Sequence, residues 1–310
     1  MKIAAVLEGG MGDCLLSCRA VGQIREKNPQ AHLALYFDVE GNETQLRTVS
    51  CIFPHLFDAS KIIRNKKFKK CVIRSQFGLE NLPSCVENIP DDIQKELKEN
   101  YDKVYDLRID SLEWAKEFFG SFFVWPRGFN FGEKENHICL NLYVSSKGHA
   151  LEKWYVIKLI KLLRMVFPGT IYALCPKGED EVYREVPIEN FQIIVGELEK
   201  EIKLIATSKL LIAVDSGLKY VGYIYNIPTL CLSSHALGAG NVPVSHKIRW
   251  NIYEKATFPL HFDAIALAKV SEYLIKNPEF WIFAADLLGG NEDNRLVRRN
   301  IVRQENLCEI

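Results

Sequence analysis

Residues 2–27 read KIAAVLEGGMGDCLLSCRAVGQIREK, and the order of apolar residues and glycines in this stretch decides the fold. The apolar run 3–7 has the length of a buried strand, the following glycines interrupt it, and apolar residues then recur at helical spacing. The stretch therefore predicts a strand over 2–7, a glycine-rich loop and a helix over 13–27. A strand that leads directly into a helix is the repeating unit of a parallel sheet.

The same succession of strand and helix recurs along the chain. In the first third, strands are expected at 31–37 and 103–107, with helices at 42–49 and 111–119. In the second half, strands are expected at 137–143, 170–174, 210–214 and 229–232, and helices at 154–167, 199–206, 218–225 and 265–276. The sequence therefore predicts the α/β class, with two Rossmann-like domains whose parallel sheets face each other across a cleft.

A proline and two glycines break both periodicities in the segment WPRGFNFGEKEN at 125–136. We place the domain boundary there, with a first domain over 1–130 and a second over 131–276. The extension 277–310 ends in an arginine-rich, helix-like tail. This tail either packs across the first domain or stays on the surface as a solvated helix.

Composition restricts the class of partner. Lysine plus arginine and aspartate plus glutamate both number 39, so no net charge attracts the chain to nucleic acid or to an anionic membrane, and only a local patch could do so. No run approaches the about 18 apolar residues of a membrane helix, so we expect at most peripheral membrane contact. The start of the chain does not resemble a signal peptide, which favours the cytoplasm or the inner face of the membrane.

The nine cysteines are scattered without the repeated CxxC spacing of a zinc site, and their odd number argues against a disulfide framework. Cys14 and Cys18 share one face of the first expected helix. Packing in the core is favoured for them over a metal or redox pair, because free cysteine is one of the most buried residue types.

The loop after the first strand is a candidate ligand site. Its glycines let a ligand approach the backbone, and the following helix offers free N–H groups to an anion. Gly10 and Gly12 fit the first two glycines of a dinucleotide fingerprint, but Leu15 stands at the third. Asp13 begins the expected helix, where an N-cap role is favoured over that of a catalytic carboxylate.

Two later loops carry similar chemistry. Asp215, Ser216 and Gly217 separate a short apolar strand from a helix, so they either cap that helix or seat a phosphate at its N-terminus. Ser145 and Ser146 follow the strand 137–143. Their hydroxyls suit an oxyanion, and a solvated loop is an equally good interpretation.

Four segments in the same order resemble glycosyltransferase family 9, the heptosyltransferases, and together span residue 1 to about 275. The segments are GGMGDCLLSCRAVGQIREKNPQAHLAL at 9–35, YDKVYDL at 101–107, Lys153-Trp154, and LIATSKLLIAVDSG at 204–217. The resemblance implies the GT-B fold, with the acceptor bound mainly by the first domain and a nucleotide sugar mainly by the second. It also implies inversion at the anomeric carbon without a metal ion or other cofactor.

The resemblance assigns roles to individual residues. Asp13 matches the proposed general base that deprotonates the acceptor hydroxyl, and Lys153 matches the lysine that neutralises the departing diphosphate. Asp215, Ser216 and Gly217 match the motif near the sugar and phosphates. Further donor-binding residues are expected at Gly10, Gly12, Ser145, Ser146 and Glu181, with Glu181 preferred to Glu179 and Asp180 as the carboxylate that holds the ribose.

The sequence also departs from the family pattern. Tyr220 stands where the family usually has a histidine three residues after the glycine, so a donor contact is altered or lost there. Lys153-Trp154 is followed by Tyr155 instead of the usual proline. These departures concern the donor, for which ADP-heptose is the first expectation and another nucleotide sugar the second.

The basic stretch 64–70 lies in the half expected to bind the acceptor. Arg64, Lys67 and Lys70 suit an acceptor rich in phosphate and carboxylate, or an anionic membrane surface. A solvated face balanced by nearby acidic residues is the favoured interpretation of this stretch.

The sequence thus favours an inverting, metal-independent glycosyltransferase of lipopolysaccharide or other glycan biosynthesis. It would transfer heptose from ADP-heptose to a hydroxyl of a glycan, a lipid-linked glycan or a protein. The first alternative is a non-catalytic nucleotide-sugar-binding or assembly protein on the same fold, which the change at Tyr220 raises. An NAD-dependent oxidoreductase is disfavoured by the incomplete glycine fingerprint.

Overall fold

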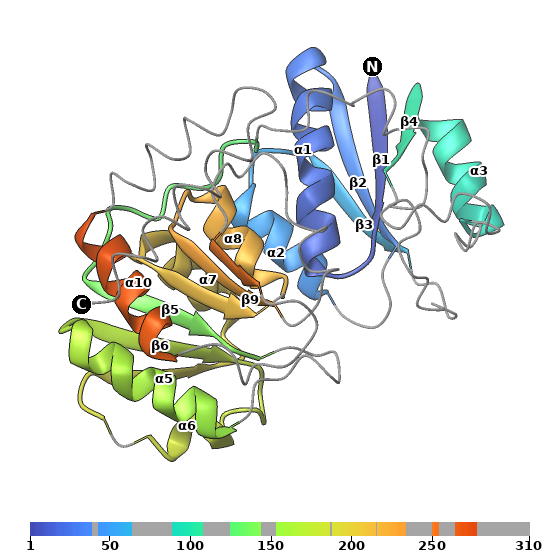
Figure 1. Ribbon diagram of the computed structural model, residues 1–310. Helices are drawn as coiled ribbons and strands as arrows, with labels where there is room; N and C mark the ends of the chain where they lie inside the picture. Colours follow the sequence, from blue (N-terminus) through green and yellow to red (C-terminus); the bar gives the residue numbers. More distant parts are fainter. Residues whose placement is uncertain are drawn as a thin grey trace.

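The computed structural model describes residues 1–38, 43–63, 89–107, 125–143, 153–186, 188–214, 216–233, 250–253 and 264–277. Within these residues the chain forms two parallel sheets with helices between and outside them (Figure 1). The α/β class and the two parallel sheets predicted from the sequence are confirmed.

The first sheet has the strand order β3-β2-β1-β4, and all of its described pairs are parallel. Its strands are β1 (Lys2–Glu8), β2 (His32–Asp38), β3 (Ala59–Ile63) and β4 (Lys103–Asp106). The helices of this half are α1 (Met11–Lys27), α2 (Thr44–Ile52) and α3 (Asp91–Asn100). Because β1 lies between β2 and β4, the loop that follows β1 starts from the interior of the sheet.

The second sheet has the order β10-β9-β8-β5-β6-β7 and is also parallel. Its strands are β5 (His137–Asn141), β6 (Thr170–Cys175), β7 (Phe191–Val195), β8 (Leu211–Val214), β9 (Thr229–Ser233) and β10 (Trp250–Tyr253). Its helices are α5 (Lys153–Val166), α6 (Glu181–Arg184), α7 (Leu198–Thr207), α8 (Leu218–Ile224) and α10 (Ala264–Lys276).

Alternation along the strands divides the core into layers. In β1, Ile3, Ala5 and Leu7 belong to a cluster that includes α1, whereas Ala4 and Val6 belong to a cluster that includes α3. In the second sheet, one face contacts α7 and α8 and the other contacts α5 and α10. The cluster on α1 and α2 is continuous with the cluster on α7 and α8, so these four helices lie between the two sheets (Figure 1).

Several elements escaped the sequence analysis. The short strands β3, β7 and β10 and the helices α3 and α6 were not expected. In β3, buried and exposed residues do not alternate regularly, and only Ile63 is buried, as is typical of a strand at the edge of a sheet. The helix expected at 111–119 and almost all of the extension 277–310 lie outside the described residues, and the boundary near residue 130 stays a prediction.

The described parts of the chain contain no helix that is both long and apolar enough to span a membrane. Cys14 and Cys18 are fully buried in the cluster around α1, which agrees with the core-packing interpretation. Burial raises the pKa of both thiols.

Candidate functional site

The loop after β1 is ordered by the side chain of Asp13. Gly9 has a φ of 90°, a conformation that favours glycine, and Gly10 is the N-cap of α1. The backbone N–H of Gly10 donates to Asp13 Oδ2 at 2.8 Å. Asp13 is therefore the third residue of the helix and not its N-cap, which corrects the position expected from the sequence, because the helix starts two residues earlier. Its carboxylate still satisfies an amide at the helix start.

The loop after β8 is held to the neighbouring strand. Ser216 Oγ donates to Asn141 Oδ1 at 2.5 Å, and Asn141 Nδ2 donates to the carbonyl of Leu174 at 3.4 Å. Asn141 ends β5 and is 4% exposed. This buried amide therefore connects the carboxyl ends of β5, β6 and β8, where open parallel sheets place their ligands.

The two loops meet each other directly. A Cβ atom added to Gly12 would lie 2.6 Å from Cε2 of Tyr220, and one added to Gly217 would lie 2.8 Å from Cβ of Met11 and 3.1 Å from the backbone N of Gly12. We call these four residues, Met11, Gly12, Gly217 and Tyr220, the glycine-loop contact. Only glycine allows this approach of the two loops, so the structure brings together two motifs that the sequence identified separately.

Tyr220 is buried within this contact. Its side chain is 5% exposed, and its ring lies beside that of Tyr223 with 5.8 Å between the centroids. Arg19 of α1 is also buried, with its guanidinium 5.5 Å from the ring centroid of Trp125. Burial lowers the pKa of Arg19 to about 10, while the Tyr220 hydroxyl acts in the opposite direction. Where the family has a histidine, this chain therefore has a ring that packs between the two halves.

Lys153 lies at the first position of α5, in a different setting. Its Nζ forms an ion pair with Glu185 Oε1 at 2.5 Å, and both side chains are about half exposed, at 47% and 51%. The hydrogen bond to Glu185 raises the pKa of Lys153, and Glu181 contributes to the same shift. Lys153 therefore carries a full positive charge near neutral pH.

Glu181 begins α6 and is exposed. The neighbouring Asp180 is 8% exposed and pairs with Arg184. Glu181 acts electrostatically on Lys153. The structure therefore places the lysine expected to neutralise the departing diphosphate near the carboxylate expected to hold the ribose. Within the described ranges no hydrogen bond or ion pair joins Lys153 to the glycine-loop contact.

Two buried ionisable residues were missed by the sequence analysis. Lys219 is fully buried at the start of α8, with its Nζ 4.9 Å from the ring centroid of Tyr220. It lies three residues before Gly222, whose face of the helix packs on Leu211 of β8 and Thr229 of β9. Glu201 of α7 is 7% exposed, and burial raises its pKa to about 7. For Lys219 the signal available in the sequence was a charged residue inside an otherwise apolar helix. For Glu201 there was no such signal, because α7 contains four charged residues.

Several expected site residues lie outside the part of the chain that the structure describes. They are Arg64, Lys67, Lys70, Ser145, Ser146 and Asp215. Within the described part, no group of three or more histidine, cysteine, aspartate or glutamate side chains is arranged to hold a metal ion.

Comparison with solved structures identifies the fold. The chain is similar to E. coli ADP-heptose lps heptosyltransferase II, with a TM-score of 0.62, 13% identity, and 90% of this chain and 100% of that chain covered. It is also similar to E. coli heptosyltransferase WaaC with ADP, with a TM-score of 0.59, 13% identity, and coverage of 88% and 100%. The chain has the fold of these heptosyltransferases.

A glycosyl transferase family 9 protein from Veillonella parvula is a further similar structure, with a TM-score of 0.50, 13% identity, and coverage of 93% and 96%. No family model matches the sequence, and the search of curated proteins finds no match. The GT-B fold expected from the four sequence segments is thus the fold observed.

Proposed function

We propose that the protein is an inverting glycosyltransferase that takes a sugar from a nucleotide-sugar donor, with ADP-heptose as the first candidate. The observation that carries the proposal is the glycine-loop contact. It joins two strand-to-helix loops at the carboxyl ends of two parallel sheets, in the fold of heptosyltransferases. Ligands of open parallel sheets bind at this edge.

Asp13 is the proposed general base. Its carboxylate lies in the first turn of α1, half-buried, next to the point where the two loops meet. In the proposed reaction the acceptor hydroxyl transfers its proton to Asp13 as its oxygen attacks the anomeric carbon of the donor. The bond from that carbon to the diphosphate oxygen breaks on the opposite face, so the configuration inverts.

The departing diphosphate needs positive charge. We propose that Lys153 supplies it together with the backbone N–H groups of the Ser216–Gly217 loop, and that Glu181 holds the ribose. Electrostatic stabilisation of this kind can replace a divalent cation, so the reaction is proposed to be metal-independent. A chelator should then leave turnover unchanged, whereas loss of turnover with chelator and recovery with added metal would contradict this part.

The acceptor is proposed to be a hydroxyl of a glycan, a lipid-linked glycan or a protein, and not nucleic acid. The proposed location is the cytoplasm, including the inner face of the membrane. The basic residues Arg64, Lys67 and Lys70 are proposed to contact the acceptor.

A donor panel tests the nucleotide-sugar proposal. The melting temperature should rise with one class of ADP-, UDP-, GDP- or CMP-sugar, because a ligand stabilises the folded state by RT ln(1 + [L]/Kd). NADH serves as the comparison ligand and should have no effect. A shift with NADH and none with any nucleotide sugar would contradict the proposal.

The second candidate is a non-catalytic protein that binds nucleotide sugars. It is favoured by Tyr220, whose ring packs against Gly12, and by the ion pair that engages Lys153. Consumption of the bound donor separates the two candidates. An enzyme consumes the donor that stabilises it, and a binding protein leaves that donor intact.

A further inference from the structure

The outward side of α5 is a second surface with a distinct chemistry. The residues Tyr155, Val156, Leu159, Ile160 and Leu163 are buried against the second sheet, which fixes the opposite side of the helix toward solvent. That side carries four exposed residues, Trp154, Lys158, Lys161 and Met165, and two residues that pack partly against the same cluster, Ile157 and Leu162. We call these six residues the α5 outer face. Trp154 is 48% exposed and Met165 is 81% exposed.

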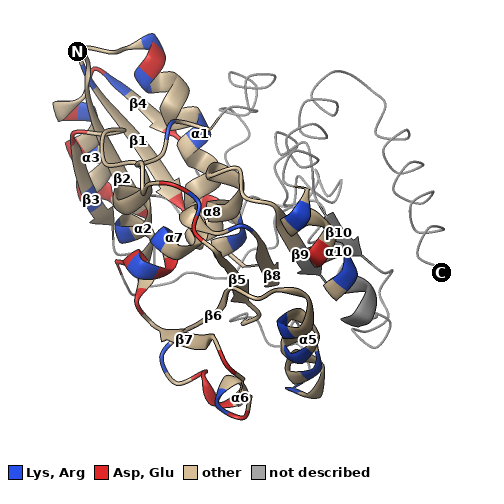
Figure 2. Ribbon diagram, turned by 90° about the vertical axis from the view of Figure 1, so that its left-hand side faces the viewer, with Lys and Arg blue, Asp and Glu red and all other residues tan. Residues whose placement is uncertain are grey.

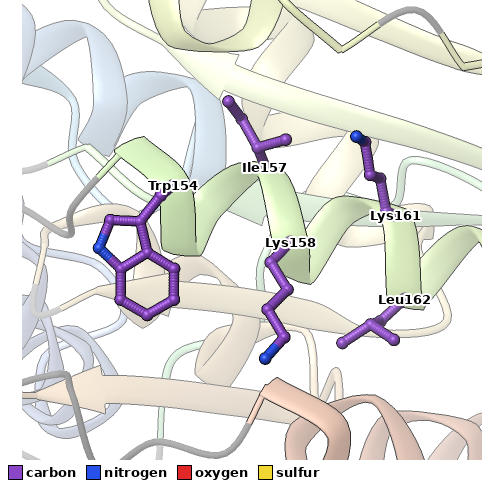
Figure 3. Close-up of a pocket in the computed structure, with 5 residues that line it drawn as sticks. All are labelled: Trp154, Ile157, Lys158, Lys161 and Leu162. Atoms are coloured by element: carbon purple, nitrogen blue, oxygen red, sulfur yellow. The ribbon is translucent and has the colours of Figure 1, made fainter.

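The α5 outer face is also hollowed. Trp154, Ile157, Lys158, Lys161 and Leu162 line an open groove with a volume of about 450 Å³. Figure 3 shows Trp154, Lys158 and Leu162 on one side of the helix and Ile157 and Lys161 on the other, so apolar and cationic side chains alternate along it. Exposed apolar side chains that lie together often mark an interaction surface, and Trp154 and Met165 lie on the same side of α5.

The charge of the helix has a single sign. The sequence of α5, KWYVIKLIKLLRMV, contains four basic residues and no acidic one, and the helix is blue without red in Figure 2. Two of the four are engaged: Lys153 pairs with Glu185, and Arg164 donates to the carbonyls of Phe167 and Gly169. Lys158 and Lys161 have no ion pair or hydrogen bond to any described residue.

We propose that the α5 outer face binds the surface of an anionic lipid bilayer. The lysines would contact lipid phosphates while the exposed Trp154 and Met165 enter the boundary between headgroups and acyl chains, as in amphipathic helices that lie in the membrane plane. A second copy of the chain fits less well, because a symmetric contact on this face would oppose its own lysines. The proposal rests on the proposed location at the inner face of the membrane and names the surface that would contact it. Vesicle binding and donor consumption are measured separately, so either can fail without the other.

Cosedimentation with vesicles tests the proposal on the full chain. Vesicles that contain phosphatidylglycerol should bind the protein, and vesicles of phosphatidylcholine alone should not. High salt should weaken the binding, because counterions screen the lysines. Absence of binding to the anionic vesicles, or equal binding to both kinds, would overturn the proposal.

Charge variants locate the surface. The double variant Lys158→Gln/Lys161→Gln should reduce vesicle affinity by roughly tenfold or more, from an expected factor of about five per lysine. The matched control is Lys95→Gln/Lys98→Gln, which removes two exposed lysines at the same spacing from α3. Equal losses in the two variants would overturn the assignment to α5.

The apolar part is tested by Trp154→Ala, which should reduce vesicle affinity while salt dependence is retained. Because these side chains are exposed, the variants should keep the native circular dichroism spectrum and melting temperature. Sedimentation velocity tests whether a second copy of the chain binds this face instead, because it measures self-association. Self-association that Trp154→Ala abolishes, without vesicle binding by the native chain, would assign the face to a second copy and overturn the proposal.

Discussion

The glycine-loop contact and the α5 outer face both belong to helices that follow strands of a parallel sheet, yet their surroundings are opposite. In the contact, Gly12 and Gly217 leave no space for a further atom, and Tyr220 is 5% exposed. On α5, Trp154 is 48% exposed and the charges face water. The first region therefore depends on close packing, and the second presents exposed charges. Substitutions in the first region should change the free energy of unfolding, whereas substitutions in the second should change ligand binding or the rate of turnover.

The largest expected difference comes from truncating one aromatic side chain in each region. Tyr220→Ala should lower the free energy of unfolding by about 3–5 kcal/mol, because it leaves a cavity in the core between the sheets. Trp154→Ala should lower it by less than about 1 kcal/mol, since half of that side chain already contacts water. Urea unfolding measures both, and similar losses would contradict the comparison.

Glu201 tests whether the layer between the sheets excludes water. Burial raises the pKa of Glu201 from 4.5 to about 7. The unfolded chain loses this proton near pH 4.5 and the folded chain only near pH 7, so the free energy of unfolding should fall as pH rises between these values. The native chain should lose about 2–3 kcal/mol more than Glu201→Gln between pH 4.5 and 8. Parallel pH profiles of the two proteins in urea unfolding would show that Glu201 is solvated.

Two glycines of the same loop give a matched pair. Gly12→Ala should lower the free energy of unfolding by about 1–3 kcal/mol, because the new methyl group meets the Tyr220 ring. Gly10→Ala places its methyl group 3.4 Å from Asp13 and should cost no more than about 1 kcal/mol. Equal stability of the two variants in urea unfolding would mean that the loops do not approach as described.

The smallest expected effect on stability is at Lys153. Lys153→Met should change the free energy of unfolding by less than about 1 kcal/mol, because its ion pair with Glu185 is half exposed. It should lower kcat for donor consumption by at least tenfold if the lysine assists the leaving group. Lys209→Met, which removes a half-buried lysine that donates to Asn136 from the loop before β8, is the control. Unchanged kcat in Lys153→Met would remove Lys153 from the proposed mechanism.

The sequence predicted those parts of the structure that depend on local spacing. The strand, glycine loop and helix of β1 and α1 follow from the apolar pattern and the glycines, and both glycine loops were assigned to a sheet edge. The start of α1 was misplaced by two residues, because it depends on the extended backbone at Gly10 and on the hydrogen bond to Asp13. Helix ends depend on such details of capping.

Contacts between distant segments could not be predicted. The approach of Tyr220 to Gly12 requires both halves to be folded, and no periodicity encodes it. The burial of Lys219 depends in the same way on β8 and β9, and the ion pair of Lys153 depends on α6. Sequence motifs thus located the candidate residues, while their exposure and partners came from the fold.

Donor consumption by the native chain and by Asp13→Asn is the most direct test of the central claim. Asparagine keeps an oxygen that can accept from the Gly10 amide but cannot take a proton, and Asp91→Asn changes a first-turn carboxylate of α3 as a control. We predict that Asp13→Asn binds the donor with native affinity and consumes it about 100- to 10,000-fold more slowly, while the control keeps the native rate. If the native chain and Asp13→Asn both bind a nucleotide sugar and neither consumes it, or if both consume it at the same rate, the account is contradicted.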